Sequence, residues 1–276
     1  MQISTIAIIG GLGKTGGRVA ERLKERGITV RAASRSTTPR FDWQDRTPWH
    51  QALEGASAAY VTFQPDLSVD WAADAIAALA KAAIEAGVGH IVLLSGRGED
   101  GAVRSEEKLK AAGVDYTVLR ASWFNQNFSE GAFVDGLLQG KLTLPAGDVP
   151  EPFVDADDIA DAAVVCLTDP RHRNQTYELT GPRALTFRQA VSEIAAASGR
   201  TIGYETVPID AFIAEMTAYG LPQETTDLLR ELFTEVLDGR NSPVMDGISR
   251  ILGRMPKDFS DYARETAVAG IWSVQS

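Results

Sequence analysis

Short apolar runs alternate with longer stretches of helical period through the first half of the chain. Five runs predict buried strands, and RFDW (40–43) predicts one more: TIAII (5–9), TVRAAS (29–34), SAAYVTF (57–63), HIVLLS (90–95) and DYTVLR (115–120). Helices are predicted between them, at 14–26, 69–86 and 104–112. Because strands that alternate with helices build repeated βαβ units, this pattern predicts an α/β protein with a Rossmann-type, doubly wound parallel sheet.

The regular alternation of predicted strands and helices ends after residue 121. The sequence predicts a helical stretch near 123–138, a helix at 155–167, a strand at 177–181, a helix at 184–199 capped by Thr186, and mostly helical structure from Pro208 onward. We therefore expect two domains. Residues 1–150 form a dinucleotide-binding domain, to which 151–181 is added, and 182–276 form a smaller, mostly helical lobe on the substrate side.

Charge and cysteine content exclude several classes of protein. The 276 residues carry a net charge of −10, which opposes nonspecific binding to nucleic acid. A single cysteine, Cys166, permits no intrachain disulfide and favours a reducing, cytoplasmic location. No uncharged apolar run approaches the roughly 18 residues of a membrane span. We expect a protein that works without nucleic acid or membrane, as a monomer or homodimer.

A glycine-rich loop, GGLGKTG (10–16), lies directly between the first strand and the first helix. Gly10 suits a tight turn, Gly13 lets the backbone approach a pyrophosphate, and Gly16 permits close packing of the helix. Glycines also end strands for purely structural reasons, but the strand before and the helix after favour a dinucleotide site. The loop lacks the Walker spacing G-x-x-x-x-G-K-[ST], so it does not indicate a nucleoside triphosphatase. We expect the rest of the loop to line the site as well: Leu12, Lys14 and Thr15.

The end of the second strand predicts which dinucleotide binds. NAD-selective sites usually place an acidic residue here, but no acid occurs between Glu25 and Asp42. Arg35 offers a planar, permanently charged fork to a 2′-phosphate, with Ser34 and Ser36 as hydroxyl donors. The alternative is a solvated loop arginine. The pattern favours NADP(H) as the cofactor.

Two further strand ends supply candidate cofactor contacts, since ligands bind at the carboxyl ends of strands in open α/β sheets. Phe63, Gln64 and Pro65 follow one strand, and Ser95 and Gly96 end the next. A serine that merely ends a strand is an equally good explanation of Ser95.

Several of these motifs together resemble the NmrA-like branch of the atypical short-chain dehydrogenases/reductases. They are GGLGKTG, the basic residue after the second strand, the LLS strand, the SEEKL helix, YTVLRASWFNQN, FVDADDIADAA and YELTGPRALTFRQA. The run VLDGRNSPVMDGISRILGRMPKDFSDYAR (236–264) resembles bacterial relatives of the agroclavine dehydrogenase-like, ergot-alkaloid group. The similarity covers nearly the whole chain. That family contains reductases of quinones or imines and also NADP(H)-sensing regulators that catalyse nothing.

The resemblance also implies candidate residues at the reacting end of the site. The main branch of the short-chain dehydrogenases, as distinct from the atypical NmrA-like branch, uses a Tyr-x-x-x-Lys pair, and if Lys108 is that lysine, Arg104 stands where the tyrosine belongs. Arginine cannot act as a general acid near neutral pH. Lys108 is then either a ribose or carbonyl contact or a plain surface lysine. Asn127 matches the family's F-x-x-N block near the nicotinamide, and Trp123 and Phe124 are substrate-side candidates unless they are core residues.

Other chemistries lack their signatures. The three histidines, His50, His90 and His172, show no metal-binding spacing, and no G-x-S-x-G motif follows a strand. The absence of these motifs predicts no metal site, and the resemblance, together with the glycine loop and Arg35, implies an NADP(H)-dependent oxidoreductase. It transfers hydride to a small conjugated, quinone-like or imine-like acceptor, which requires less help from a protein acid. The alternative is a non-catalytic NADP(H)-sensing regulatory protein that binds a protein partner.

Overall fold

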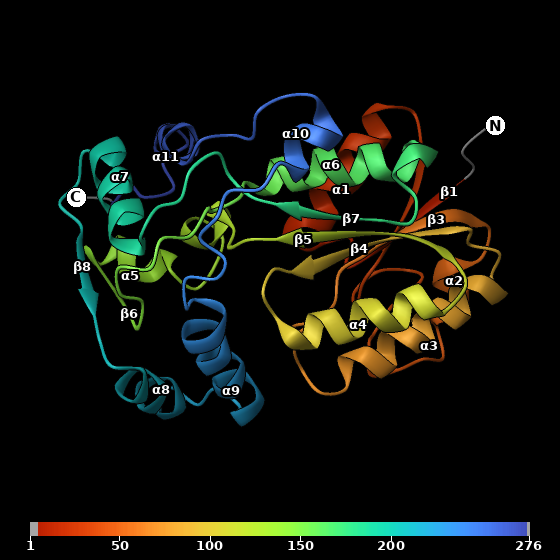
Figure 1. The fold of residues 1–276 in the computed structure, drawn as a ribbon, viewed down its shortest axis with the longest axis horizontal. Coiled ribbons are helices and arrows are strands. Elements are labelled where there is room, and N and C mark those ends of the chain that lie inside the picture. The colour runs from red at the N-terminus through yellow and green to blue at the C-terminus, as the bar shows by residue number, and fades with distance from the viewer. Residues whose placement is uncertain (1–4, 275–276) are drawn as a thin grey trace. The chain divides into compact units, whose positions relative to one another are not determined.

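The computed structural model describes residues 5–274 and confirms the Rossmann-type α/β fold (Figure 1). Its main sheet is parallel throughout and has the strand order β2-β1-β3-β4-β5-β7. The strands are β1 (Thr5–Ile9), β2 (Thr29–Ala33), β3 (Ala56–Val61), β4 (His90–Gly96), β5 (Asp115–Ala121) and β7 (Gln175–Leu179). The chain leaves β1 for β2 on one side and returns to β3 on the other. The connections that follow β1 and β3 therefore lead to opposite faces of the sheet, and it is at the carboxyl ends of the strands beside such a reversal that sheets of this kind bind ligands.

The strand predicted at 40–43 does not form. This segment makes isolated bridges, including one between Ser34 and Arg40, and the Phe41 amide donates to the Ser34 carbonyl at 2.8 Å. The Phe41 ring stacks on Trp49, with ring centroids 5.3 Å apart. The prediction was wrong because these aromatic residues fold back on the core and the backbone closes a loop.

Helices cover both faces of the sheet (Figure 1). One face carries α2 (Trp49–Leu53), α3 (Ala72–Glu85) and α4 (Asp100–Ala111), and the other carries α1 (Lys14–Glu25), α6 (Ala156–Thr168) and α10 (Gly247–Leu252). On the first face, Ile76 and Leu79 of α3 and Leu109 of α4 pack into one apolar cluster with the strands. Burial of this apolar surface is what holds the helices on the sheet.

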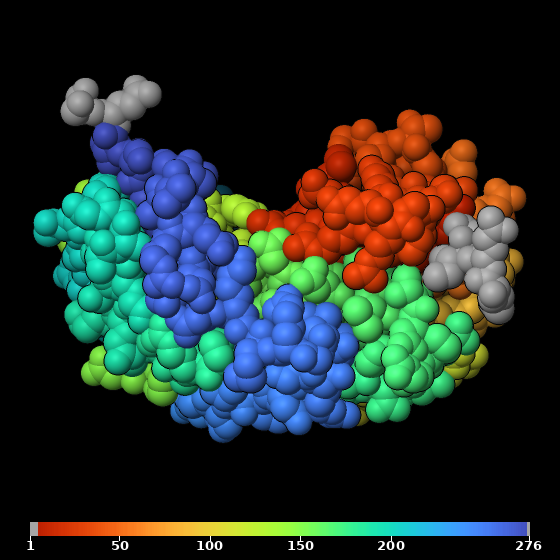
Figure 2. All heavy atoms as spheres, turned by 90° about the horizontal axis from the view of Figure 1, so that it is seen from above, coloured from red at the N-terminus to blue at the C-terminus, as the bar shows by residue number. Residues whose placement is uncertain are grey.

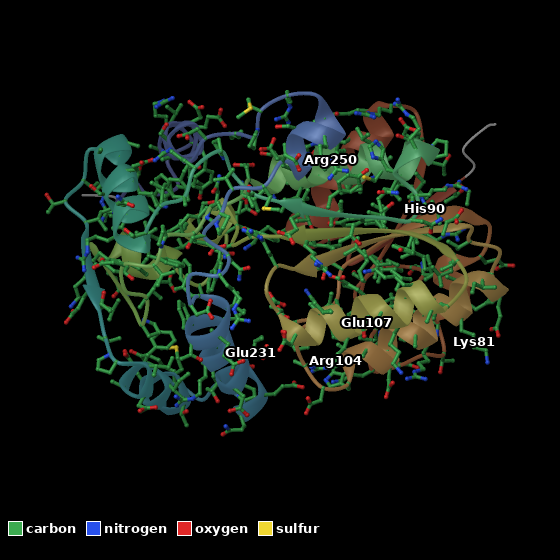
Figure 3. The ribbon with its side chains drawn as sticks, in the orientation of Figure 1. Lys81, His90, Arg104, Glu107, Glu231 and Arg250 are labelled. Carbon is green, nitrogen blue, oxygen red and sulfur yellow. The ribbon has the colours of Figure 1, made fainter. Side chains whose placement is uncertain are left out.

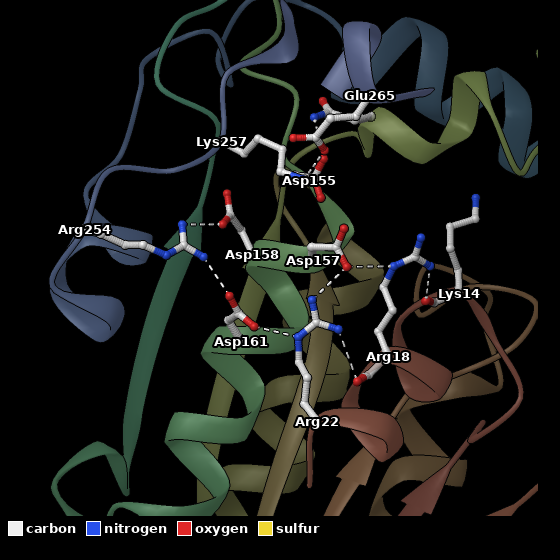
Figure 4. A network of polar contacts seen from close by, with 11 residues as sticks. Lys14, Arg18, Arg22, Asp155, Asp157, Asp158, Asp161, Arg254, Lys257 and Glu265 are labelled. Atoms are coloured by element: carbon white, nitrogen blue, oxygen red, sulfur yellow. Dashed lines mark hydrogen bonds and ion pairs between the residues drawn. The ribbon is translucent and has the colours of Figure 1, made fainter. Parts of the chain in front are cut away.

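An ion-pair network joins the three helices of the second face (Figure 4). Arg22 of α1 bonds Asp161 of α6 at 2.6 Å and Asp157 at 2.8 Å. Arg254, just after α10, contacts Asp161 at 2.7 Å and the buried Asp158 at 2.6 Å. The space-filling view shows the red atoms of α1 beside the green atoms of α6 (Figure 2). The acidic start of α6 therefore pairs with arginines as well as with the helix dipole.

Contacts divide the chain into two compact units. The first comprises residues 1–121, 156–179 and 247–254, and the second comprises 122–155, 180–246 and 255–276. This division places 122–155 outside the sheet-bearing unit and α10 inside it, whereas the sequence suggests a first domain of 1–150 with 151–181 added and a second domain of 182–276. The difference arises because α10 packs on α6 and β7, far from its neighbours in sequence.

The second unit is mostly helical. Its helices are α5 (Val134–Leu138), α7 (Phe187–Ser198), α8 (Ile209–Ala218), α9 (Gln223–Glu231) and α11 (Phe259–Val268), with a 3-10 turn at Asn125–Phe128 and a π-helical turn at Leu232–Val236. Thr186 caps α7 as predicted, through a reciprocal capping box with Gln189. The unit also contains a two-stranded parallel sheet that the sequence did not predict, made of β6 (Lys141–Leu144) and β8 (Gly203–Thr206). Within residues 5–274, no helix combines the length and apolar character that a membrane span requires.

Candidate functional site

The glycine loop forms a tight turn that brings the first helix up against the end of β1. Gly10 has a φ of +82°, and a Cβ there would lie 2.0 Å from Thr62 Oγ1. A Cβ on Gly16 would lie 2.3 Å from the Gly10 carbonyl oxygen. Gly13, by contrast, has an ordinary extended backbone, and its Cβ would meet only that same oxygen, at 3.1 Å. The structure thus needs glycine at Gly10 and Gly16 for its own packing, whereas a Cβ on Gly13 would require only a shift of a few tenths of an ångström.

The N-terminus of α1 has the properties of an anion site. Gly13 is the N-cap and provides no side-chain cap, and the first turn contains no acidic residue. The amides of that turn are therefore not masked by a capping side chain, and the helix dipole favours negative charge beside them. Leu12 is exposed on the loop. These features fit the pyrophosphate of a dinucleotide.

Thr15 faces the sheet instead of the solvent. It is 4% exposed, and the buried Tyr60 hydroxyl donates to its Oγ1 at 3.0 Å. Burial raises the pKa of Tyr60 above its ordinary value, so the phenol stays a donor. Tyr60, which the sequence did not single out, therefore helps to hold the first turn of α1.

The loop after β2 presents Arg35 to solvent. Arg35 is exposed and makes no hydrogen bond or ion pair with any residue in 5–274. Hydrogen bonds hold the residues around Arg35 in place. Thr37 Oγ1 accepts from the Ser34 amide at 2.7 Å and donates to the Pro39 carbonyl at 2.8 Å. An ordered loop that carries an uncommitted guanidinium fits a 2′-phosphate.

The loop after β3 combines core and exposed residues. Phe63 is buried, with its ring centroid 4.5 Å from that of Trp43 and 4.8 Å from that of Trp71. Gln64 and Pro65 are exposed. Phe63 thus has the contacts of a core residue, and the two exposed residues are the ones open to a ligand.

The end of β4 is crowded with polar groups. Ser95 is 4% exposed, and its hydroxyl donates to Glu106 Oε1 at 2.8 Å. Arg120 binds both oxygens of the same carboxylate, and this raises the pKa of Arg120, chiefly through the hydrogen bond. A Cβ on Gly96 would lie about 2 Å from the Glu99 carboxylate, so a side chain there would have to displace that carboxylate. The sequence analysis did not single out Glu106. The available signal was its position on α4, where it is a charged residue on the same helix face as the apolar Ala102 and Leu109.

Helix α4 also carries the proposed catalytic lysine. Lys108 is about half exposed, and its Nζ lies 3.9 Å from Asp74 of α3. Arg104 and Glu107 are exposed on the same helix (Figure 3). Lys108 therefore does not join Ser95 and Glu106 at the strand end. Its catalytic role stays a prediction.

The remaining candidates belong to the second unit. Trp123 is half-buried among aromatic rings, with centroids 5.3 Å from Phe187 and 5.2 Å from Phe233. Asn127 is also half-buried. The neighbouring Asn125 is fully buried; it donates to Asp155 at 3.2 Å, and its Oδ1 has no partner among residues 5–274. Phe124 forms a bridge with Val154.

Comparisons with known proteins agree with this architecture. The model of the NmrA-like family matches residues 2–262. An NAD(P)H azoreductase from Xenophilus azovorans is 27% identical over 96% of this chain and 98% of its own, and agroclavine dehydrogenase from Claviceps fusiformis is 28% identical over 95% and 96%. An NADPH-dependent quinone oxidoreductase from Escherichia coli, solved with NADPH, superposes with a TM-score of 0.76 at 24% identity, covering 94% of this chain and 99% of its own. Because the family model spans nearly the whole described chain, this protein belongs to the NmrA-like family.

Proposed function

We propose that this protein is an NADP(H)-dependent oxidoreductase that delivers hydride to a small conjugated, quinone-like or imine-like acceptor. The observation that carries the proposal is an uncapped, acid-free helix N-terminus behind a glycine turn, with the uncommitted Arg35 on the neighbouring strand end. By their names, the similar proteins act on azo compounds, agroclavine and quinones. They support an oxidoreductase, and the class of acceptor is our inference.

Different residues of the first unit bind different parts of the cofactor. The backbone of 10–16 and the first turn of α1 hold the pyrophosphate, while Arg35, Ser34 and Ser36 hold the 2′-phosphate. Bound NADPH supplies the hydride, and the chain supplies orientation and exclusion of water. Lys108 and Asn127 are kept as predicted contacts at the reacting end.

The choice of acceptor follows from the missing phenol. If Lys108 is the lysine of a Tyr-x-x-x-Lys pair, the tyrosine position is taken by Arg104, an exposed arginine that cannot give up a proton near neutral pH. Hydride addition to an iminium carbon neutralises the nitrogen and needs no proton. Reduction of a quinone requires one proton in addition to the hydride, and water can supply that proton to the reduced oxygen.

Steady-state NADPH oxidation with a quinone, an azo dye and a cyclic iminium compound tests the proposal. We expect turnover with at least one of them, and a much lower rate at subsaturating NADPH in Gly13→Val, which serves as the matched control for cofactor binding. Lys108→Ala and Asn127→Ala are expected to lower kcat/KM by about tenfold to a thousandfold. Tight NADPH binding without turnover of any acceptor would instead favour the regulatory sensor.

A further inference from the structure

Three polar residues form one row across the sheet near the carboxyl ends of the strands. Ser95 of β4 pairs in register with Arg120 of β5, which pairs with Glu178 of β7. Register partners in a sheet point to the same face. Here that face is covered by α4, from which Glu106 reaches the row.

The Glu106 carboxylate is buried and surrounded by donors. Its Oε1 accepts from Ser95 Oγ at 2.8 Å and from Arg120 Nε at 2.8 Å. Its Oε2 accepts from Arg120 NH2 at 2.6 Å and from Lys110 Nζ at 3.3 Å. Arginine and lysine can only donate, so both oxygens of Glu106 act as acceptors.

This arrangement sets the polarity of the Ser95 hydroxyl. A serine hydroxyl has one hydrogen and two lone pairs, and the hydrogen is committed to Glu106. The Ser95 oxygen can therefore accept a hydrogen bond from a ligand but cannot donate one, and donation to an anion strengthens it as an acceptor. A carbonyl oxygen of a ligand has no hydrogen to donate. It would therefore face only the lone pairs of the Ser95 oxygen and could form no hydrogen bond with it.

We propose that Ser95 accepts a hydrogen bond from an N–H or O–H group on the nicotinamide riboside half of the cofactor, and that Glu106 is the positioning residue that enforces this polarity. The inference rests on the proposed function, because it takes the cofactor to lie at the strand ends. The donor is either the carboxamide N–H or a ribose hydroxyl. Ser95 does not polarise a substrate carbonyl.

Titration calorimetry with NADP⁺ and its acetylpyridine analogue tests the proposal, since the analogue replaces the carboxamide by a ketone without N–H. Ser95→Ala should fold, because Glu106 keeps its contacts with Arg120 and Lys110. We expect this variant to bind NADP⁺ about three- to tenfold more weakly. The control Ser57→Ala removes a hydroxyl at the other end of the sheet, where it donates to the Thr5 carbonyl, and should bind normally.

The analogue identifies the donor. If the carboxamide donates, wild type and Ser95→Ala bind the analogue equally; if a ribose hydroxyl donates, the ratio seen with NADP⁺ persists. Equal binding of NADP⁺ by both proteins overturns the proposal, whereas failure of the wild type to bind NADP⁺ at all overturns the proposed function itself.

A second pair of variants tests Glu106 as a positioning residue. Glu106→Gln keeps the shape of the side chain but removes the charge that commits the Ser95 hydrogen. We expect it to weaken NADP⁺ binding when Ser95 is present and to add no loss in the Ser95→Ala background. Equal losses in both backgrounds would give Glu106 a purely structural role and contradict the proposed polarity.

Discussion

Gly13 and Gly10 lie three positions apart in one loop, but glycine is needed at the two positions for different reasons. Gly10 needs a positive φ and has Thr62 where a Cβ would be, whereas Gly13 has an ordinary extended backbone and a Cβ there would make one tight contact, at 3.1 Å from the Gly10 carbonyl oxygen. Of the two, Gly13 is thus the position at which the fold can accommodate a side chain with a small local shift. A ligand that approaches the helix N-terminus is what would exclude it.

We predict that Gly13→Val changes the free energy of unfolding by only about 1 kcal/mol, the usual effect of a poor N-cap residue, while NADPH binding falls at least about tenfold. Gly10→Ala should instead destabilise the fold, because it combines a left-handed backbone with a clash. Chemical denaturation and cofactor titration on both variants separate the two effects. Native affinity in Gly13→Val would mean that the loop does not meet the pyrophosphate.

At the scale of single elements, β4 begins with a buried histidine that responds to pH. Thr117 Oγ1 donates to the His172 carbonyl at 2.7 Å, so His90 Nε2 must be the donor in its own 2.9 Å bond to Thr117. This assigns the Nε2–H tautomer to His90. Burial, with a smaller effect of Arg173, lowers the pKa of His90 to about 4.

The depressed pKa of His90 predicts a loss of stability in acid. The unfolded chain protonates this histidine near pH 6.5 and the folded chain only near pH 4, so the free energy of unfolding falls as pH drops between these values, by up to about 3 kcal/mol. His90→Gln keeps an N–H donor without titrating and should flatten that part of the profile. His50→Gln, at an exposed position, is the control. Identical pH profiles for wild type and His90→Gln would rule out this origin of acid sensitivity.

The second face of the sheet depends on Arg254, which joins α10 to α6. Its partner Asp158 is 1% exposed, and replacing Arg254 removes a guanidinium that lies 2.6 Å from this buried carboxylate. We expect Arg254→Met to lower the free energy of unfolding by about 3 kcal/mol. The control Arg264→Met breaks an exposed pair with Asp261 on α11 and should cost less than about 1 kcal/mol. Thermal denaturation of both variants checks the difference, and equal effects would contradict a special role for the buried carboxylate.

At the scale of the whole molecule, patterns within single segments of the sequence were enough to predict most elements in the first half of the chain. The strands of the main sheet and the loop at 10–16 depend on apolar runs and glycines that can be identified one segment at a time. The pairing of β6 with β8 was not predictable in this way, because each strand is short and its partner is distant in sequence. The same is true of Glu106, whose partners come from β4 and β5 and become visible only when the chain is folded.

The central claim is that this protein binds NADP(H) through the glycine loop and selects it through Arg35. Titration calorimetry of NADP⁺ and NAD⁺ on wild type, Arg35→Ala and Arg40→Ala tests it most directly; Arg40 is a matched control in the same loop, already paired with Asp42 at 2.9 Å. The account predicts that wild type prefers NADP⁺, that Arg35→Ala loses about tenfold to a hundredfold in NADP⁺ affinity with little change for NAD⁺, and that Arg40→Ala resembles wild type. Equal affinity of wild type and Arg35→Ala for NADP⁺ would contradict the account.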